Sequence, residues 1–239
     1  MAAKKNNKDV KQEQQIIEIE PLTLGSAKIR LNGDGILVTH ALDAETRQRI
    51  TRKQTGEDTE TTREFRSPVE EFMNATYPVH GPAKPKPRMK DGQKIYNERA
   101  VKSWASKTKF GIPIVAFKNA IVSAGRNTST FTMKQLRQIL HVIPADPKYP
   151  DSAIINAPTP PIMRSDMVKI GNNIPMERFR PQWNNWSVDI VIKYDYDSIN
   201  VAQVANMLAK AGQFVGVMEG RPEKCGLSWG RFNLGQFEG

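Results

Sequence analysis

Basic residues gather in one segment of this sequence, and cations at that density are suited to holding phosphate groups. Residues 81–109 contain nine Lys or Arg against two Asp or Glu, a net charge of +7, whereas the whole chain of 239 residues carries +10. Such a concentration of positive charge attracts polyanions and speeds their encounter. A solubilising loop is the alternative interpretation. The candidate nucleic-acid contacts in this segment are Lys84, Lys86, Arg88, Lys90, Lys94 and Tyr96.

Two further groups of cations lie in the C-terminal third, each beside residues that favour contact with nucleic acid. Arg178 and Arg180 precede Trp183 and Trp186, whose rings can stack on unpaired bases. The alternative is that both tryptophans are core anchors ahead of a strand, and we expect Trp186 in particular to be buried. The glycine-rich segment 220–230 lets backbone N–H groups approach a phosphate, with a flexible connection as the alternative interpretation. The cations of this third group are Arg221, Lys224 and Arg231.

Catalytic chemistry has little support in the sequence. His40 precedes Asp43 and Glu45 at a spacing that suits a general base, yet no nucleophile motif or phosphate-binding loop accompanies it. The acidic residues at 57–64 are typical of a solvated loop rather than a metal site. A single cysteine, Cys225, excludes an internal disulfide. We therefore expect no catalytic residue, no metal and no cofactor, and hence a protein that is not an enzyme.

The elements that must position these cations are expected from residue 19 onward. Residues 1–18 are polar and lack periodicity, which predicts a disordered tail. Alternation predicts a strand through 27–31, a turn at 32–35, a second strand at 36–40 and a helix capped by Asp43. Four prolines at 78–87 predict a loop, so the basic, Pro-rich segment at about 77–109 is expected to be an insertion in a single α+β domain spanning 19–239.

The middle of the chain predicts two helices and one strand. Apolar residues at 114, 117, 121 and 124 recur with helical spacing before Gly125, and Thr132 is placed to cap a helix over 133–141. Residues 139–143 also fit a strand, so both assignments stay open there. A strand is expected over 162–168, followed by an irregular basic segment over 171–182.

The last fifty residues contain the clearest local pattern. Apolar residues alternate over 188–194, Ser198 can cap a helix over 201–211, and Gly212 can end it. Further strands are expected to start at 214–217 and to cover 229–234. A strand, a helix and a strand with antiparallel neighbours form half of a ferredoxin-like unit. The predicted fold class is therefore α+β, with a ferredoxin-like or RRM-like antiparallel sheet, packed helices and one or two copies of the unit.

Two resemblances accompany this pattern. The segments Arg180-Pro181, Gly220-Arg221-Pro222-Glu223-Lys224 and Gly230-Arg231-Phe232 are similar to a widespread, uncharacterised family of tailed-bacteriophage proteins. The similarity covers roughly the C-terminal third and implies a product made in the host cytoplasm, but no activity. The order of helix, Gly-rich loop and Gly-Arg-Phe strand also resembles the RAMP superfamily, the RRM-like backbone subunits of CRISPR complexes, and implies RNA binding.

Together these features predict a phage-encoded basic protein that binds nucleic acid, with single-stranded DNA or RNA favoured, and that does not catalyse a reaction. Phosphate neutralisation would give the affinity, and aromatic stacking the preference for unpaired bases. A homo-oligomer along the strand is compatible with this role. No run of about 20 apolar residues is present, so no membrane partner is expected. The alternative is a phage structural or host-interaction protein that binds an acidic protein.

Overall fold

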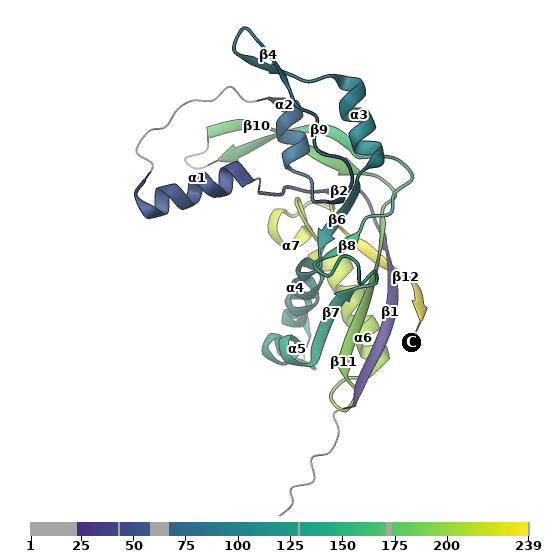
Figure 1. The fold of residues 1–239 in the computed structure, drawn as a ribbon. Helices are drawn as coiled ribbons and strands as arrows, with labels where there is room; N and C mark the ends of the chain where they lie inside the picture. The colour runs from purple at the N-terminus through teal and green to yellow at the C-terminus, as the bar shows by residue number, and fades with distance from the viewer. Residues whose placement is uncertain (1–22, 43, 58–66, 129, 171–173, 239) are drawn as a thin grey trace, which may run out of the picture.

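A computed structural model gives the architecture, and it describes residues 23–42, 44–57, 67–128, 130–170 and 174–238 (Figure 1). The predicted tail at 1–18 and the cap at Asp43 lie outside these residues. Among the described helices, none is both long enough and apolar enough to cross a membrane.

The central element is a four-stranded antiparallel sheet in the order β12-β1-β11-β7. Along the chain its strands alternate with two helices as β1, α4, β7, β11, α6 and β12, which is the ferredoxin-like arrangement. The bounds are β1 Leu24–Gly33, α4 Val115–Ala124, β7 Leu140–Pro144, β11 Ser187–Asp195, α6 Val201–Lys210 and β12 Phe232–Glu238. The α+β prediction is confirmed. The other sheets of the described residues have three or two strands, so one copy of the unit is seen there.

The sheet has one apolar face, because β1 and β11 pair with their inward residues in register. Ala27 lies opposite Ile192 and Ile29 opposite Ile190, and all four side chains are fully buried. At the end of β1, a Cβ on Gly33 would lie 2.2 Å from Nε1 of Trp186. Glycine at this position therefore lets the Trp186 ring pack over the strand, and the prediction that Trp186 is buried is confirmed.

The first insertion separates β1 from α4 and contains the basic segment. Its elements are β2 Leu37–Val38, α1 Ala44–Thr55, α2 Pro68–Asn74, β3 Pro78–His80, β4 Arg88–Lys90, β5 Gln93–Ile95, α3 Glu98–Lys107 and β6 Lys109–Pro113. Strands β4 and β5 pair with each other in a hairpin that projects from the body near α3 (Figure 1). The loop predicted around the prolines at 78–87 therefore contains the short strand β3 and leads into β4 at Arg88, whereas α3 lies in the remainder of the basic segment.

The second insertion separates β7 from β11 and forms a long hairpin. Its strands are β8 Ser152–Ile154, β9 Ile162–Ile170 and β10 Ile174–Trp183. Strand β10 pairs with β9 and with β2, while β8 joins β3 and β6 in another sheet. In Figure 1 the β9–β10 hairpin extends to the same side as α1. The strand expected at 162–168 is confirmed.

The prediction of an irregular segment at 171–182 is wrong, because residues 174–183 form β10. The strand turns polar side chains inward: Arg180 is buried and Arg178 is half-buried. Pro175 and Pro181 also argue against a strand at the level of the sequence, because proline is rare inside sheets. A strand with arginines on its inner side has no hydrophobic alternation for sequence reasoning to detect.

Gly212 does not end α6, and residues 214–217 do not start a strand. The chain continues as a π-helix, η2 Ala211–Val215. A Cβ on Gly212 would lie 1.9 Å from the carbonyl oxygen of Phe232, so this glycine allows η2 to pack against β12. A short helix, α7 Pro222–Cys225, follows within the glycine-rich segment.

Helix capping is partly as predicted. Thr132 caps α5 Met133–Ile139 through a capping box with Gln135, after which the chain enters β7 at residue 140. Residue 139 is the last residue of α5 and residues 140–143 belong to β7, so each alternative for 139–143 is right in part. The cap of α6 is Asn200 rather than Ser198, because the Asn200 side chain accepts the N–H of Gln203. A 3₁₀ turn, η1 Gly125–Asn127, follows α4.

Candidate nucleic-acid interface

The β4–β5 hairpin presents cations that the fold does not use. Lys86, Arg88 and Lys90 are exposed, and within the described part of the chain no ion pair joins any of them to a carboxylate. The apolar side chains beside them are exposed too, Met89 by 64% and Ile95 by 48%. Folding alone gives no reason for this composition, so the hairpin is a candidate contact for an external anion.

The remaining predicted residues of the basic segment anchor it to α2. The Lys94 ammonium lies 2.9 Å from the Glu70 carboxylate, and the Lys84 ammonium donates to Asn74 Oδ1 at 2.8 Å. Tyr96 is half-buried, and burial followed by the charge of Glu70 raises its pKa. These three residues therefore attach the basic segment to α2. Arg88 and Lys90 are exposed on β4, and Lys86 is exposed just before this strand.

The structure places the three predicted residues of β10, namely Arg178, Arg180 and Trp183, in three different environments. Arg178 makes an ion pair with Glu71 of α2 at 3.1 Å. Arg180 is only 8% exposed, and its Nε has no hydrogen-bond partner among the described residues. The ring of Trp183 is 3% exposed and packs edge-on against Phe110, with 5.7 Å between ring centroids. Stacking of Trp183 on a base, which the sequence suggested, is therefore not available in this structure.

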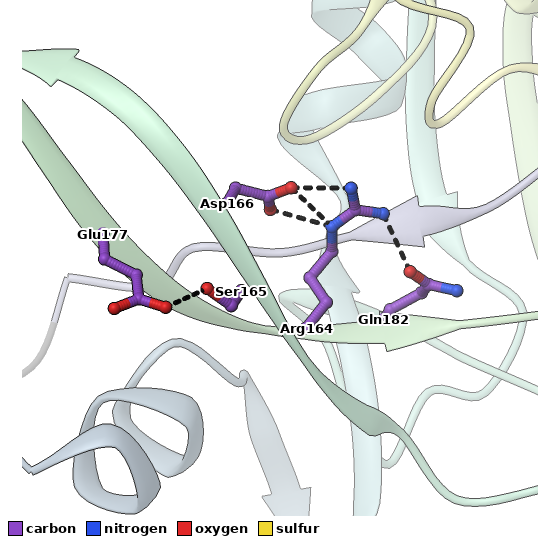
Figure 2. A network of polar contacts seen from close by, with 5 residues as sticks. All are labelled: Arg164, Ser165, Asp166, Glu177 and Gln182. Carbon is purple, nitrogen blue, oxygen red and sulfur yellow. Dashed lines mark hydrogen bonds and ion pairs between the residues drawn. The ribbon is translucent and has the colours of Figure 1, made fainter.

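A third arginine of the same hairpin is satisfied within it. Figure 2 shows the Arg164 guanidinium facing Asp166, at 2.6 Å, and donating to Gln182 at 2.9 Å. Arg164 and Arg180 are directly opposite in the β9–β10 register. Facing like charges repel each other. Arg164 has a carboxylate partner, whereas none of the described carboxylates forms an ion pair with Arg180, so Arg180 is the cation of this pair without a described counter-charge.

His40 lies at the edge of this arginine cluster. Its pKa is lowered chiefly by burial and next by the charge of Arg180, while Glu219 acts in the opposite direction. The sequence places Asp43 and Glu45 at a spacing that suits a general base but favours an ordinary satisfied or exposed histidine. Asp43 and the Glu45 side chain lie outside the described part, so the spacing is not tested. The described charged groups that act on the pKa of His40 are thus two arginines, Arg180 and Arg178, and two carboxylates, Glu219 and Glu71.

The cations of the glycine-rich segment have internal partners to differing degrees. Arg231 lies 2.7 Å from Asp34 and also donates to Gln213 at 2.6 Å. Arg221 donates to the carbonyl of Met218 at 3.1 Å and approaches Glu223 at 3.7 Å. Lys224 is exposed. Arg231 is therefore largely a structural residue, whereas Arg221 and Lys224 stay accessible to an anion.

Two cavities on the surface share Tyr77. The larger, of about 630 Å³, lies among α4, α5, η2 and the segment that follows η2. The smaller, of about 290 Å³, includes Arg47 of α1 and Lys84. Because Tyr77 lines both, the two cavities adjoin at this aromatic ring.

Sequence reasoning missed several of these lining residues. The missed residues come from four separate segments, and each is a single cation or aromatic residue with no motif around it. They are Tyr77, Arg47, Arg126 and Arg137. The helical pattern of 114–124 marked the buried side of α4, and Arg126 follows its end. Only the tertiary structure brings Arg126 and Arg137 to the glycine-rich segment.

The outer face of the four-stranded sheet differs from the base-stacking surface of RNA-binding RRM domains, which use aromatic residues on their central strands. Exposed side chains on β1 include Lys28 and Arg30, and those on β7 are His141 and Ile143. Arg30 pairs with Asp189 of β11 at 2.8 Å. Since β1 has no aromatic residue, the insertions and the glycine-rich segment are the better candidates for contact.

The described residues contain no group of three or more His, Cys, Asp or Glu side chains arranged to hold a metal ion. Cys225 is exposed at the end of α7. The acidic residues at 58–64 lie outside the described part of the chain.

Comparisons with known proteins show distant structural similarity and no sequence match. No protein-family model matches the chain, and no curated protein matches its sequence. Among solved structures, the chain is similar to one in "Cryo-EM structure of the Type III-B Cmr-beta bound to cognate target RNA", with a TM-score of 0.43 and 8% identity. The alignment covers 90% of this chain and 60% of that chain.

Proposed function

We propose that this protein binds nucleic acid and that the β4–β5 hairpin supplies its main electrostatic contact. The observation that carries the proposal is the set of three exposed cations, Lys86, Arg88 and Lys90, that no described carboxylate neutralises. Each phosphate that such a cation neutralises releases condensed counterions, which gives affinity without sequence preference. Binding should therefore weaken steeply as salt rises.

Arg180 supports a second contact at the base of the β9–β10 hairpin. A buried guanidinium without a counter-charge is costly, whereas the same group bound to a phosphate would be compensated. Arg178 is already paired with Glu71 and contributes less. The proposal therefore assigns the phosphate contact of this region to Arg180.

We propose a preference for single strands, in DNA or RNA, on the basis of the accessible aromatic side chains. Tyr77 lines both cavities, and Phe214 of η2 is 59% exposed. An unpaired base can reach such rings and gain about 1–3 kcal/mol from stacking, whereas a paired base stays within its duplex. These rings replace Trp183 in the account, because Trp183 is buried.

We propose binding without catalysis, since the sequence has no nucleophile motif or phosphate-binding loop. A role in the cytoplasm of a phage-infected host follows from the resemblance of the C-terminal third to tailed-phage proteins. Association of several copies along one strand is compatible with binding without catalysis and with a role in a phage-infected host.

The test is a charge reversal on the hairpin. The variant Lys86→Glu/Arg88→Glu/Lys90→Glu is compared with Lys134→Glu/Lys169→Glu/Lys210→Glu, which makes the same change in net charge at exposed positions on α5, β9 and α6. Loss of three phosphate contacts should lower the affinity for a single-stranded oligonucleotide by at least about 100-fold at low salt, and the control should lose far less.

Equal loss in both variants would mean that net charge alone drives the binding, and would contradict the hairpin assignment. No binding of the unaltered protein to any nucleic acid would overturn the proposal. The exposed cations would then fit an acidic protein partner, which co-purification from host lysate in the presence of nuclease would detect.

A further inference from the structure

The larger cavity combines an apolar floor with a cationic rim. Its volume of about 630 Å³ falls within the range of small-molecule sites. Six apolar residues line the cavity and are called its floor below, four of them buried (Ala120, Val122, Val215 and Val217) and two nearer the surface (Val115 and Ala116). The rim includes Arg126, Arg137, Arg221 and Lys224, and Glu223 is the one carboxylate among its described lining residues. Such a lining matches a ligand with one flat apolar part and one anionic part.

Glu223 occupies the position that an anion would take in this cavity. Its carboxylate accepts the hydroxyl of Ser123 and lies 3.5 Å from Arg126 and 3.7 Å from Arg221. Charge-assisted hydrogen bonds are shorter, at about 2.7–2.9 Å. The two guanidinium groups are therefore gathered around one carboxylate without closing strong bonds to it, and they retain donors for a second anion.

The segment that carries Arg221 is held in a fixed shape. Met218 has a φ of 64°, in the left-handed region that non-glycine residues rarely adopt. Its carbonyl accepts the Arg221 guanidinium at 3.1 Å. At the other end of the segment, Gly230 donates its N–H to Ile36 and accepts that of Val217. A rigid backbone lowers the entropic cost of binding, so the rim is preorganised.

We propose that this cavity binds one mononucleotide unit, with its phosphate held by Arg126, Arg221 and Lys224 and its base over the apolar floor. A free nucleoside monophosphate and the phosphorylated end of a strand offer this same chemistry. The second source rests on the proposed function, whereas the first does not depend on it. Glu223 limits the affinity, because it competes with the phosphate for the two arginines.

The first experiment titrates the purified protein with AMP, UMP and inorganic phosphate by calorimetry. Tighter binding of a nucleoside monophosphate than of phosphate is expected, because only the nucleotide contacts the floor. A parallel titration compares a short single-stranded oligonucleotide carrying a 5′-phosphate with its 5′-hydroxyl form. A gain from the terminal phosphate identifies the strand end as the source, and equal affinities identify the free nucleotide.

Three variants then test the assignment of the lining. Arg126→Gln should weaken nucleotide binding about tenfold, through the loss of a charge-assisted hydrogen bond. Glu223→Gln should strengthen it several-fold, because the competing charge is removed. Asn119→Trp, at an exposed lining position of α4, should block the cavity. Lys134→Gln is the matched control, since Lys134 is an exposed cation of α5 outside the lining.

The outcomes separate this inference from the proposed function. If oligonucleotides bind but nucleoside monophosphates do not bind at millimolar concentration, the mononucleotide site is wrong while the function stands. If inorganic phosphate binds as tightly as AMP, the base has no subsite and the inference is overturned. Binding that survives Asn119→Trp, in a variant whose melting temperature is unchanged, also contradicts it. Nucleotide binding that persists in the hairpin variant, after oligonucleotide binding is lost, supports the cavity and the hairpin as separate contacts.

Discussion

The guanidinium of Arg164 lies 4.2 Å from the centre of the Trp229 ring. This contact joins strand β9 of the second insertion to the glycine-rich segment that precedes β12. The same ring packs against Gly220, where a Cβ would lie 2.1 Å from the ring. Trp229 therefore contacts an arginine and a glycine that come from two different parts of the proposed interface.

Removing the Trp229 ring should loosen the β9–β10 hairpin from the glycine-rich segment. Trp229→Ala is expected to lower the free energy of unfolding by about 1–2 kcal/mol, through loss of the cation–π contact and of buried ring area. Trp229→Phe keeps an aromatic ring beneath Arg164, so its free energy of unfolding should fall by less. Urea unfolding of the two variants measures the difference, and equal losses would show that the ring contributes area alone.

Gly230 should tolerate no side chain, in contrast to a nearby glycine of similar backbone conformation. Gly230 has a φ of 63° and Gly226 a φ of 67°. A Cβ on Gly230 would lie 1.8 Å from the carbonyl oxygen of Val217, whereas a Cβ on Gly226 would meet nothing within 4 Å. Gly226→Ala should therefore cost about 1–2 kcal/mol from conformation alone.

Gly230→Ala adds a backbone clash to that conformational cost and should destabilise the protein by more than about 3 kcal/mol. Chemical denaturation of both variants gives the comparison. Similar stabilities would contradict the packing described for this segment.

The ferredoxin-like sheet was predictable because its strands and helices follow simple periodicities. Alternation marked β11, and helical spacing marked α4 and α6. Strand β10 was missed since its inward residue Arg180 is a cation, and η2 was missed because Gly212 serves packing rather than termination. Local pattern thus fails where tertiary contacts place a polar side chain inside or use glycine for close approach.

Loss of the charge at Arg180 and loss of the charge at Arg178 should change the free energy of unfolding in opposite directions. Arg180→Met removes a buried guanidinium that pairs with no carboxylate in the described part of the chain, so it should raise the free energy of unfolding by about 1–3 kcal/mol in the absence of ligand. Arg178→Met breaks the ion pair with Glu71 and should lower it by about 1–2 kcal/mol.

Thermal unfolding distinguishes the two arginines, and oligonucleotide affinity completes the comparison. Arg180→Met should bind more weakly although it is more stable, which is the behaviour of a binding residue that costs stability. A destabilised Arg180→Met variant would mean that the guanidinium has a structural partner.

Stability should fall as the medium is acidified through the titration of His40. Burial, followed by the charge of Arg180, holds the pKa of His40 below its ordinary value of 6.5, with Arg178 acting in the same direction and Glu219 and Glu71 opposing it. The unfolded chain therefore takes up a proton more readily than the folded chain. The stability that His40 contributes is present above pH 6.5 and is lost as the pH falls through the folded-state pKa.

Replacing His40 with Asn should flatten this dependence. Unfolding free energies measured at about pH 7.5 and about pH 5.5 provide the comparison. An unchanged slope in His40→Asn would show that other groups dominate this pH range.

The candidate site was only partly predictable from the sequence. A count of charges located the hairpin cations, because charge density is a local property. Whether a cation is free depends on tertiary partners: Lys94 pairs with Glu70 and Arg231 with Asp34, which no spacing rule reveals. The same reason explains why Arg126 entered only with the structure, since it meets Glu223 from a distant part of the chain.

The most direct test of nucleic-acid binding is fluorescence anisotropy with labelled single-stranded DNA, single-stranded RNA and duplex DNA across a salt series. The account predicts that single strands bind more tightly than the duplex, and that affinity falls linearly with salt on a log–log plot, with a slope of at least about 2 from three phosphate contacts. No binding to any of the three, or an affinity that salt leaves unchanged, would contradict it.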